Sequence, residues 1–162
     1  MNSNPSVAAA RKRRIFLVDD HPLVREGLTN LINEQNDLIV CGEAEDSAGA
    51  MTGIAKTRPD VALVDISLKN ESGLELVKNL ESQFLLVALI VLSMHDEALY
   101  AESALRAGAR GYVMKRESTK SVLASIRRVL EVAFMSAKES LTAWLAGLAR
   151  HLRGPKVRRW NV

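Results

Sequence analysis

The chain has 162 residues, of which 48% are hydrophobic and 25% are charged, a composition typical of a folded globular protein. This length suits one domain with flanking segments and is too short for two ordinary domains. The longest apolar run, residues 84–92, is about half as long as a membrane span needs to be. The N-terminus lacks the apolar core of a signal peptide, so a cytoplasmic protein is expected.

The formal net charge of +3 is unevenly distributed. Residues 1–14 carry four basic and no acidic side chains, residues 15–132 carry twelve basic and eighteen acidic ones, and residues 133–162 carry six basic and one acidic. An acidic body with basic ends is not typical of a nucleic-acid-binding domain. Only the ends are therefore expected to contact polyanions.

Strand and helix patterns alternate from residue 15 to residue 132, which predicts an α/β fold with a doubly wound, five-stranded parallel sheet. The expected strands lie near 15–19, 38–43, 60–65, 86–92 and 110–114. The expected helices lie near 22–35, 47–57, 73–82, 96–107 and 118–132. Short continuous apolar runs are typical of strands buried on both faces. The lone Cys41 lies in the apolar run of the second expected strand, so it is expected to be a small buried hydrophobic residue.

Local signals predict several helix ends. Pro22 suits a first helical position, because its missing N–H would have no partner there. Ser72 and Glu75 have capping-box spacing, which predicts a helix start. Gly108 fits a helix C-cap and the turn into the fifth strand.

Beyond residue 132 the pattern predicts an extra, amphipathic C-terminal helix. Ser136 and Glu139 form another capping box, and an apolar stripe continues at helical spacing to Gly154-Pro155. The stripe consists of Leu141, Trp144, Leu145, Leu148 and Leu152. Because an isolated helix of this length is marginal in water, the stripe is expected to pack on its own domain or on a second chain.

Polar residues stand where four of the apolar runs stop. Asp19 and Asp20 follow the first run, Asp65 ends the third, Ser93 ends the fourth, and Lys115 follows the fifth. Each residue alone has a simpler explanation as a helix cap, a turn residue or a solvated charge. Ligands of parallel sheets bind beyond the carboxyl ends of the strands, so the coincidence of all four positions favours one shared site.

The residue types at these positions indicate cation and phosphoryl chemistry. Clustered carboxylates repel one another unless a cation neutralises them, and oxygen ligands in an open cleft suit Mg²⁺ together with phosphate oxygens. A carboxylate can itself become an aspartyl phosphate. Lys115 is placed to contact the phosphoryl oxygens, and Ser93 to donate a hydrogen bond to one of them.

Four stretches match a known family in kind, order and spacing. They are 15–22 (IFLVDDHP), 65–69 (DISLK) with 72–75 (SGLE), 92–96 (LSMHD) and 111–115 (GYVMK). They resemble the receiver domain of two-component response regulators, most closely the LuxR/NarL-type branch. The match covers roughly residues 12–132, and the segment after it is too short for the helix-turn-helix output domain of that branch.

The resemblance implies a flavodoxin-like sheet of strand order 2-1-3-4-5 with helices on both faces. It implies that Asp65 accepts a phosphoryl group from a sensor histidine kinase. It also implies Mg²⁺ as cofactor, held by Asp19, Asp20, Asp65 and the backbone carbonyl of Ser67. The expected organisation is a basic tail over 1–13, a receiver domain over 14–132, and an amphipathic helix with a basic tail over 133–162.

The resemblance also assigns roles around the phosphoryl group. Lys115 would pair with it, Ser93 would move toward it, and Tyr112 would turn inward as the switching aromatic. From the residues alone, plain packing is the favoured explanation of Tyr112, because a lone aromatic residue at a strand end more often simply packs. Ser67 and His95 occupy positions that tune hydrolysis of the phosphoryl group.

The sequence therefore predicts a phosphorylation-dependent signalling switch rather than an enzyme, as part of or derived from a LuxR-type transcriptional regulator. The alternative is a Mg²⁺-dependent phosphohydrolase with an aspartyl-phosphate intermediate, which needs a second acid where Ser67 stands. Homodimerisation through residues 96–132 or the C-terminal helix is a further expectation. Apart from a missing output domain, only weak DNA contact is expected from the basic end, with Arg150, His151, Arg153, Lys156, Arg158 and Arg159.

Overall fold

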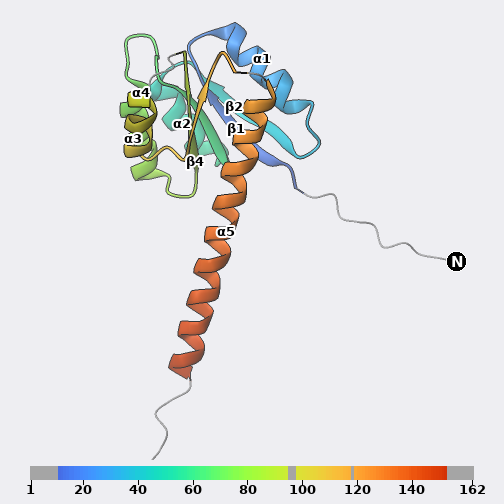
Figure 1. Cartoon of the computed structure of the whole chain (residues 1–162), viewed down its shortest axis with the longest axis vertical. Coiled ribbons are helices and arrows are strands. Elements are labelled where there is room, and N and C mark those ends of the chain that lie inside the picture. The colour runs from blue at the N-terminus through green and yellow to red at the C-terminus, as the bar shows by residue number, and fades with distance from the viewer. Residues whose placement is uncertain (1–10, 95–97, 118, 153–162) are drawn as a thin grey trace, which may run out of the picture. The chain divides into compact units, whose positions relative to one another are not determined.

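The computed structural model describes residues 11–94, 98–117 and 119–152, in which strands and helices alternate (Figure 1). The strands are β1 Arg13–Val18, β2 Leu38–Ala44, β3 Val61–Asp65, β4 Ala88–Ser93 and β5 Gly111–Met114. The helices are α1 Pro22–Asn33, α2 Ser47–Thr57, α3 Gly73–Gln83, α4 Ala98–Arg106 and α5 Thr119–Leu152. The chain divides into two compact units, Met1–Leu130 and Glu131–Val162.

The five strands form one parallel sheet in the order β2-β1-β3-β4-β5, which confirms the predicted topology. The register pairs Ile15 with Val61, Val61 with Ala88, and Ile90 with Gly111. Because all strands run in the same direction, their carboxyl ends meet at one edge of the sheet. The polar residues that end the strands are therefore brought to that edge.

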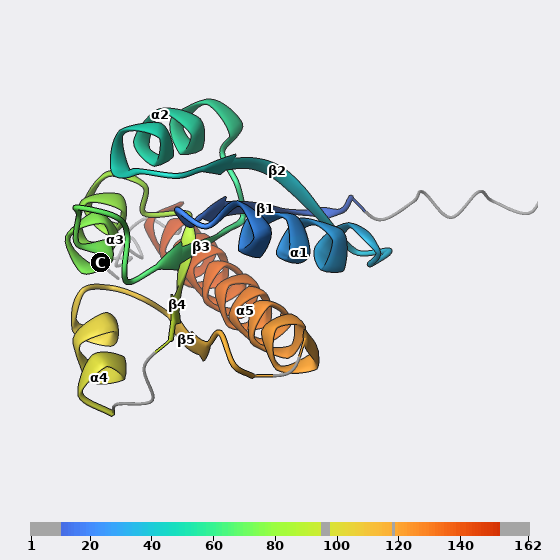
Figure 2. The ribbon, with the colours of Figure 1, turned by 90° about the horizontal axis from the view of Figure 1, so that it is seen from above.

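Two hydrophobic clusters cover the two faces of the sheet. Phe16 and Val18 belong to a cluster that includes residues of α2, α3 and α4, whereas Ile15 and Leu17 belong to a cluster with residues of α1 and the beginning of α5. Neighbouring residues of β1 thus serve opposite faces, as the two-residue period of a strand requires. Figure 2 shows α2 and α1 on opposite sides of the sheet, which confirms the predicted helices on both faces.

The strand β2 is less buried than its apolar run predicted. Only Leu38 and Ala44 of this strand are buried, Ile39 is 41% exposed, and Cys41 is half-buried against the first cluster. The expectation of burial on both faces was wrong here, because β2 lies at an edge of the sheet and has a neighbouring strand on one side only.

The helix ends predicted at Pro22, Ser72 and Gly108 are confirmed in the structure. Pro22 is the first residue of α1, and the hydroxyl of Ser72 accepts a hydrogen bond from the backbone N–H of Glu75 at 3.4 Å. Gly108 follows α4 with a φ of +108°, a conformation that an L-residue with a side chain rarely adopts. It therefore provides the turn into β5.

The two helices predicted over 118–132 and from Ser136 are one helix in the structure, α5. Residues 133–135 include neither glycine nor proline, so nothing in the sequence interrupts the helical backbone there. Ser136 is consequently an interior residue of the helix and not an N-cap. The predicted end at Gly154-Pro155 lies outside the described residues, within which no helix is long and apolar enough to cross a membrane.

Arg127, near the beginning of α5, forms hydrogen bonds with the loop between α1 and β2. Its guanidinium donates to both carboxylate oxygens of Asp37, at 2.9 and 3.0 Å, and to the side chain of Gln35 at 3.1 Å. The hydrogen bonds from Arg127 lower the pKa of Asp37, and the pKa of Arg127 is raised in turn. Both side chains are about half exposed, so this pair contributes at most about 1 kcal/mol.

Gly73, the first residue of α3, packs directly against the end of β3. A Cβ atom at this position would lie 2.1 Å from the backbone oxygen of Asp65 and 2.6 Å from the Cα atom of Ile66. Backbone atoms cannot move aside as a flexible side chain can. The absence of a side chain at Gly73 therefore allows α3 to start against the end of this strand.

Replacing Gly73→Ala is expected to lower the free energy of unfolding by about 1–3 kcal/mol, because the methyl group collides with backbone. Gly27→Ala in α1 is the matched control: its Cβ would meet nothing within 4 Å, and alanine favours a helix by about 0.5–1 kcal/mol. Urea denaturation of the three proteins measures both changes. Equal stability of Gly73→Ala and the wild type would contradict the close packing.

Candidate functional site

The acidic residues of the site are held at the carboxyl ends of β1 and β3. Asp65 is the last residue of β3, and Asp19 follows β1 with its backbone N–H bound to the carbonyl of Ala44 at 3.1 Å. Both aspartates are only 1% exposed. Two buried carboxylates so close together require a compensating positive charge.

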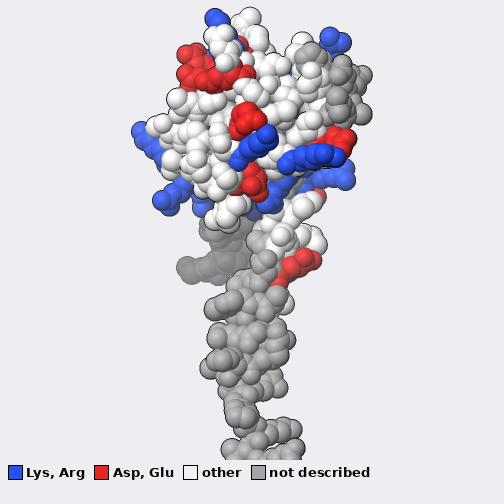
Figure 3. Space-filling model, turned by 90° about the vertical axis from the view of Figure 1, so that its left-hand side faces the viewer, with Lys and Arg blue, Asp and Glu red and all other residues white. Residues whose placement is uncertain are grey.

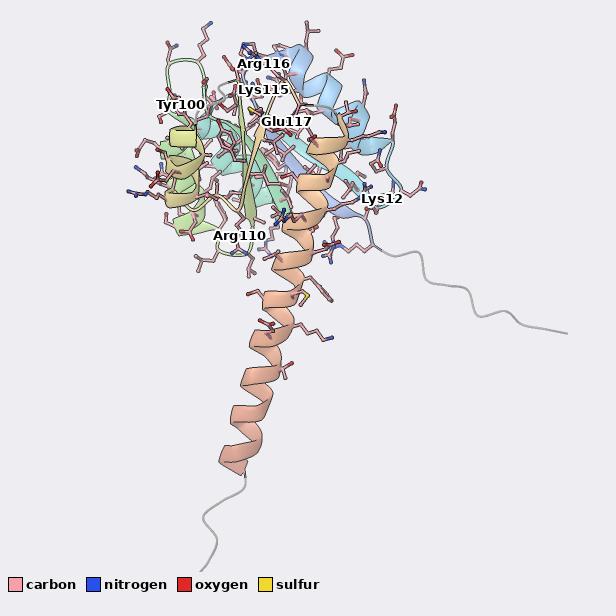
Figure 4. The ribbon with its side chains drawn as sticks, viewed as in Figure 1. Lys12, Tyr100, Arg110, Lys115, Arg116 and Glu117 are labelled. Carbon is pink, nitrogen blue, oxygen red and sulfur yellow. The ribbon has the colours of Figure 1, made fainter. Side chains whose placement is uncertain are left out.

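Lys115 supplies that charge from the end of β5. Its Nζ atom lies 2.6 Å from Oδ2 of Asp19 and 2.8 Å from Oδ2 of Asp65. Figure 4 places Lys115 at the end of β5 opposite Arg110. Burial by itself lowers the pKa of the Lys115 amine, but hydrogen bonds to Asp19 and Asp65 and their negative charges raise it overall. The lysine therefore stays protonated at neutral pH.

Asp20 and His21 complete the acidic cluster. The Nδ1 atom of His21 lies 3.1 Å from Oδ1 of Asp19 and 2.9 Å from Oδ1 of Asp20. The side chain of Asp20 is 18% exposed, and apart from this contact with the His21 ring its Oδ1 atom has no partner among the described residues. A carboxylate oxygen with so few partners can accept a further ligand.

The donor atoms of this cluster fit a divalent cation. One ligand atom from each of Asp19, Asp20, His21 and Asp65 lies within 4.8 Å of the others. Three carboxylates face the single ammonium of Lys115, so negative charge is in excess at the site. Carboxylate oxygens in a partly open site are ligands that Mg²⁺ prefers, and Oδ1 of Asp20, whose one contact among the described residues is the His21 ring, gives it a position to bind.

Of the other predicted site residues, Ser93 and Ser67 are bonded directly to Lys115 and Asp65. Ser93 is completely buried at the end of β4, and its carbonyl accepts a hydrogen bond from the backbone N–H of Lys115 at 2.7 Å. The backbone N–H of Ser67 donates to Oδ1 of Asp65 at 3.0 Å. Tyr112 is half-buried and packs against the cluster beneath α2, α3 and α4. His95 lies outside the described residues.

Two charged residues near the site were not identified from the sequence. Arg25 donates to the backbone oxygen of Asp19 at 2.5 Å. The carboxylate of Glu71 accepts from the backbone N–H of Ser47 at 2.9 Å, which ties the loop after Asp65 to the start of α2. Only the position of Arg25 one helical turn after His21 hinted at a place near the site.

Comparison with known proteins agrees with this geometry. Residues 15–127 match the family described as the response regulator receiver domain. The transcriptional regulatory protein YxjL of Bacillus subtilis, described as uncharacterized, is 37% identical over 116 residues, which make up 72% of this chain and 53% of YxjL. The oxygen regulatory protein NreC of Staphylococcus aureus is 35% identical over 117 residues, 72% of this chain and 54% of NreC.

Solved structures give the same result. A LuxR-family two-component response regulator from Aurantimonas sp. SI85-9A1 aligns with a TM-score of 0.71 and 32% identity, over 75% of this chain and 86% of that one. The signal receiver domain of the putative response regulator NarL from Mycobacterium tuberculosis aligns with a TM-score of 0.70 and 30% identity, over 75% and 98% of the two chains.

The chain belongs to the response regulator receiver domain family, which confirms the resemblance read from its motifs. Its relatives are regulators of the LuxR and NarL type, and it spans about half the length of the curated relatives it matches. Receiver domains are signalling switches that bind Mg²⁺ at an acidic pocket, and this chain has an aspartate cluster at the corresponding place.

Replacing Lys115→Ala is expected to lower the free energy of unfolding by about 3–5 kcal/mol at pH 7 without Mg²⁺, because Asp19 and Asp65 are left as uncompensated buried charges. Because folding raises the pKa of Lys115, its contribution is complete below its unfolded pKa of about 10.4 and disappears as the pH rises through the folded value.

Urea denaturation between pH 7 and pH 11 would measure this difference in the free energy of unfolding. Lys120→Ala, which removes an exposed lysine from α5, is the matched control and should change stability by less than about 0.5 kcal/mol. A Lys115→Ala protein as stable as this control at pH 7 would refute the role of the buried ammonium.

Proposed function

We propose that this chain is a phosphorylation-dependent signalling switch of a two-component phosphorelay, with Asp65 as the phosphoryl acceptor. The observation that supports this most directly is the position of Asp65, buried at the end of β3 and 2.8 Å from the Lys115 ammonium. The donor atoms of Asp19, Asp20, His21 and Asp65, which lie within 4.8 Å of one another, support a cation beside it.

The proposed ligands of Mg²⁺ are Asp20, Asp65, the backbone carbonyl of Ser67 and, directly or through water, Asp19. When bound, Mg²⁺ would neutralise negative charge on the phosphoryl group during its transfer. The hydrogen bond from the Ser67 N–H to Oδ1 of Asp65 holds this carboxylate in place at 3.0 Å. The site is thereby preorganised for the transfer.

In the transfer step, a carboxylate oxygen of Asp65 forms a bond to the phosphorus atom of the donor. The bond between phosphorus and the donor atom breaks, and the donor leaves with the bonding electrons. With a sensor histidine kinase the donor atom is a nitrogen of its phosphohistidine. Lys115 stabilises charge on the transferring oxygens, because its ammonium lies within hydrogen-bonding distance of Asp65.

Ser93 and Tyr112 are the proposed switch residues. Ser93 ends β4 beside Lys115, from where its hydroxyl would donate to the phosphoryl group. Tyr112 pairs with Val91 in the sheet and would turn inward when the Ser93 segment moves. Ser67 and His95 are the residues proposed to tune hydrolysis, since each follows a site residue by two positions.

The proposed partner is a sensor histidine kinase, which phosphorylates response regulators of this kind. The names of the relatives support an origin in a LuxR-type transcriptional regulator. Homodimerisation through residues 96–132 or the C-terminal helix stays a prediction.

The described body of the chain offers little support for direct DNA binding. On the face shown in Figure 3, acidic and basic side chains are interspersed. The pairs Lys78 with Glu75 and Arg106 with Glu102 neutralise each other on α3 and α4, at 2.7 and 2.5 Å. Weak contact between DNA and the basic C-terminal residues stays a prediction, because the structure does not describe these side chains.

The alternative of a phosphohydrolase has less support at this site. Such an enzyme needs a general acid close to the phosphorylated aspartate. Two positions after Asp65 the chain has Ser67, which contacts Asp65 through its backbone N–H and carries no carboxylate. A switch holds its phosphoryl group, whereas a phosphohydrolase would release phosphate continuously from a small phosphate ester.

Incubation with Mg²⁺ and acetyl phosphate is expected to add one phosphoryl group to the wild type and none to Asp65→Asn, because the amide is not a nucleophile of the required kind. Intact-mass spectrometry measures the addition. Asp37→Asn, which changes an exposed aspartate outside the site, is the control and should accept the group like the wild type. A phosphorylated Asp65→Asn protein would show that another residue is the acceptor.

A further inference from the structure

Arg25 is a charged residue beside the site that the proposed chemistry does not use. It lies in the first turn of α1, and its side chain is only 13% exposed. One end of its guanidinium donates to the backbone oxygen of Asp19 at 2.5 Å, and its Nε atom lies 3.6 Å from a carboxylate oxygen of Glu43 on β2. The guanidinium thus bridges the end of β1 and the neighbouring strand.

The carbonyl that Arg25 binds belongs to the peptide group between Asp19 and Asp20. A peptide group is planar, so the direction of its carbonyl fixes the plane that also contains the Cα atom of Asp20. The backbone N–H of Asp19 is held on its other side by the carbonyl of Ala44 at 3.1 Å. Together these bonds leave the peptide between the two acids little freedom to rotate.

The side chain of Asp20 is less constrained than that of Asp19. Asp19 accepts hydrogen bonds from the backbone N–H of His21 at 2.9 Å and contacts Lys115 at 2.6 Å. For Asp20, the Oδ1 atom contacts Nδ1 of His21 at 2.9 Å and has no other partner among the described residues. The direction of its carboxylate therefore depends on this contact and on its backbone. That backbone is fixed before Asp20 by Arg25 and after it by His21, which is extended because it precedes Pro22.

We propose that Arg25 is a positioning residue that directs the carboxylate of Asp20 toward the divalent cation. The proposal rests on the Mg²⁺ site of the proposed function. The electrostatic effect of Arg25 on cation binding has the opposite sign. A positive charge near the ligands weakens cation binding, so if Arg25 acted through its charge alone, its removal would tighten the binding. The sign of the change in Mg²⁺ affinity on substitution of Arg25 therefore separates a positioning role from a purely electrostatic one.

Isothermal titration calorimetry with Mg²⁺, in the absence of any phosphoryl donor, measures the dissociation constant for Mg²⁺ and so tests the role of Arg25. Arg25→Gln is expected to raise the dissociation constant for Mg²⁺ about tenfold, as is typical when a residue that orients a metal ligand is lost. Arg25→Lys keeps the charge and a donor for the carbonyl of Asp19, and it should recover most of the affinity. A purely electrostatic role predicts the reverse for Arg25→Gln.

Arg14 offers a matched control at the opposite end of β1. Its guanidinium also donates to a backbone carbonyl, that of Thr57, at 2.9 Å, and its Nε atom likewise lacks a hydrogen bond to a described residue. Arg14→Gln removes the same charge and the same kind of bond. It should lower the unfolding midpoint while leaving the Mg²⁺ affinity within about twofold of the wild type.

The outcomes separate this inference from the proposed function. A wild type that does not bind Mg²⁺ overturns both. A wild type that binds Mg²⁺, with Arg25→Gln binding equally or more tightly, overturns the positioning role alone, as does an equal loss in Arg14→Gln. If Arg25→Gln does not fold, Glu43→Gln replaces it. This variant loosens the guanidinium from β2, and a Mg²⁺ affinity equal to that of the wild type in Glu43→Gln overturns the inference.

Discussion

The site depends on one buried ammonium group placed between two buried carboxylates. Lys115 reaches Asp19 and Asp65 at 2.6 and 2.8 Å, and all three side chains are less than 10% exposed. Unpaired, either acid would have to take up a proton or turn toward water, since an isolated charge is very costly inside a protein. The three residues come from the ends of three different strands, so this pairing exists only when the whole sheet is assembled.

Much of this arrangement could be predicted because parallel strands impose a simple geometry. Their carboxyl ends share one edge of the sheet. The polar residues that stand at the ends of the apolar runs, Asp19, Asp65 and Lys115, were therefore expected to approach one another. The alternation of strands and helices also indicated the layers, and both of these inferences need only the direction of the strands. The strand order, in contrast, was implied by the resemblance to receiver domains.

Other features depend on contacts that a local pattern does not contain. The apolar run of β2 did not reveal that Ile39 would lie at an edge, since burial depends on which strands are neighbours. The capping-box spacing at Ser136 was outweighed by an uninterrupted helical backbone. The bond from Arg25 to the Asp19 carbonyl and the approach of Gly73 to Asp65 are set by backbone positions that only the folded chain defines.

The 2.7 Å hydrogen bond between the backbone N–H of Lys115 and the carbonyl of Ser93 joins the last residue of β4 to the residue after β5. The two main chains are thereby linked at the edge of the sheet where the site lies. A displacement of one main chain at this point would strain its bond to the other, so the backbone segments that carry the Ser93 hydroxyl and the Lys115 ammonium are mechanically coupled.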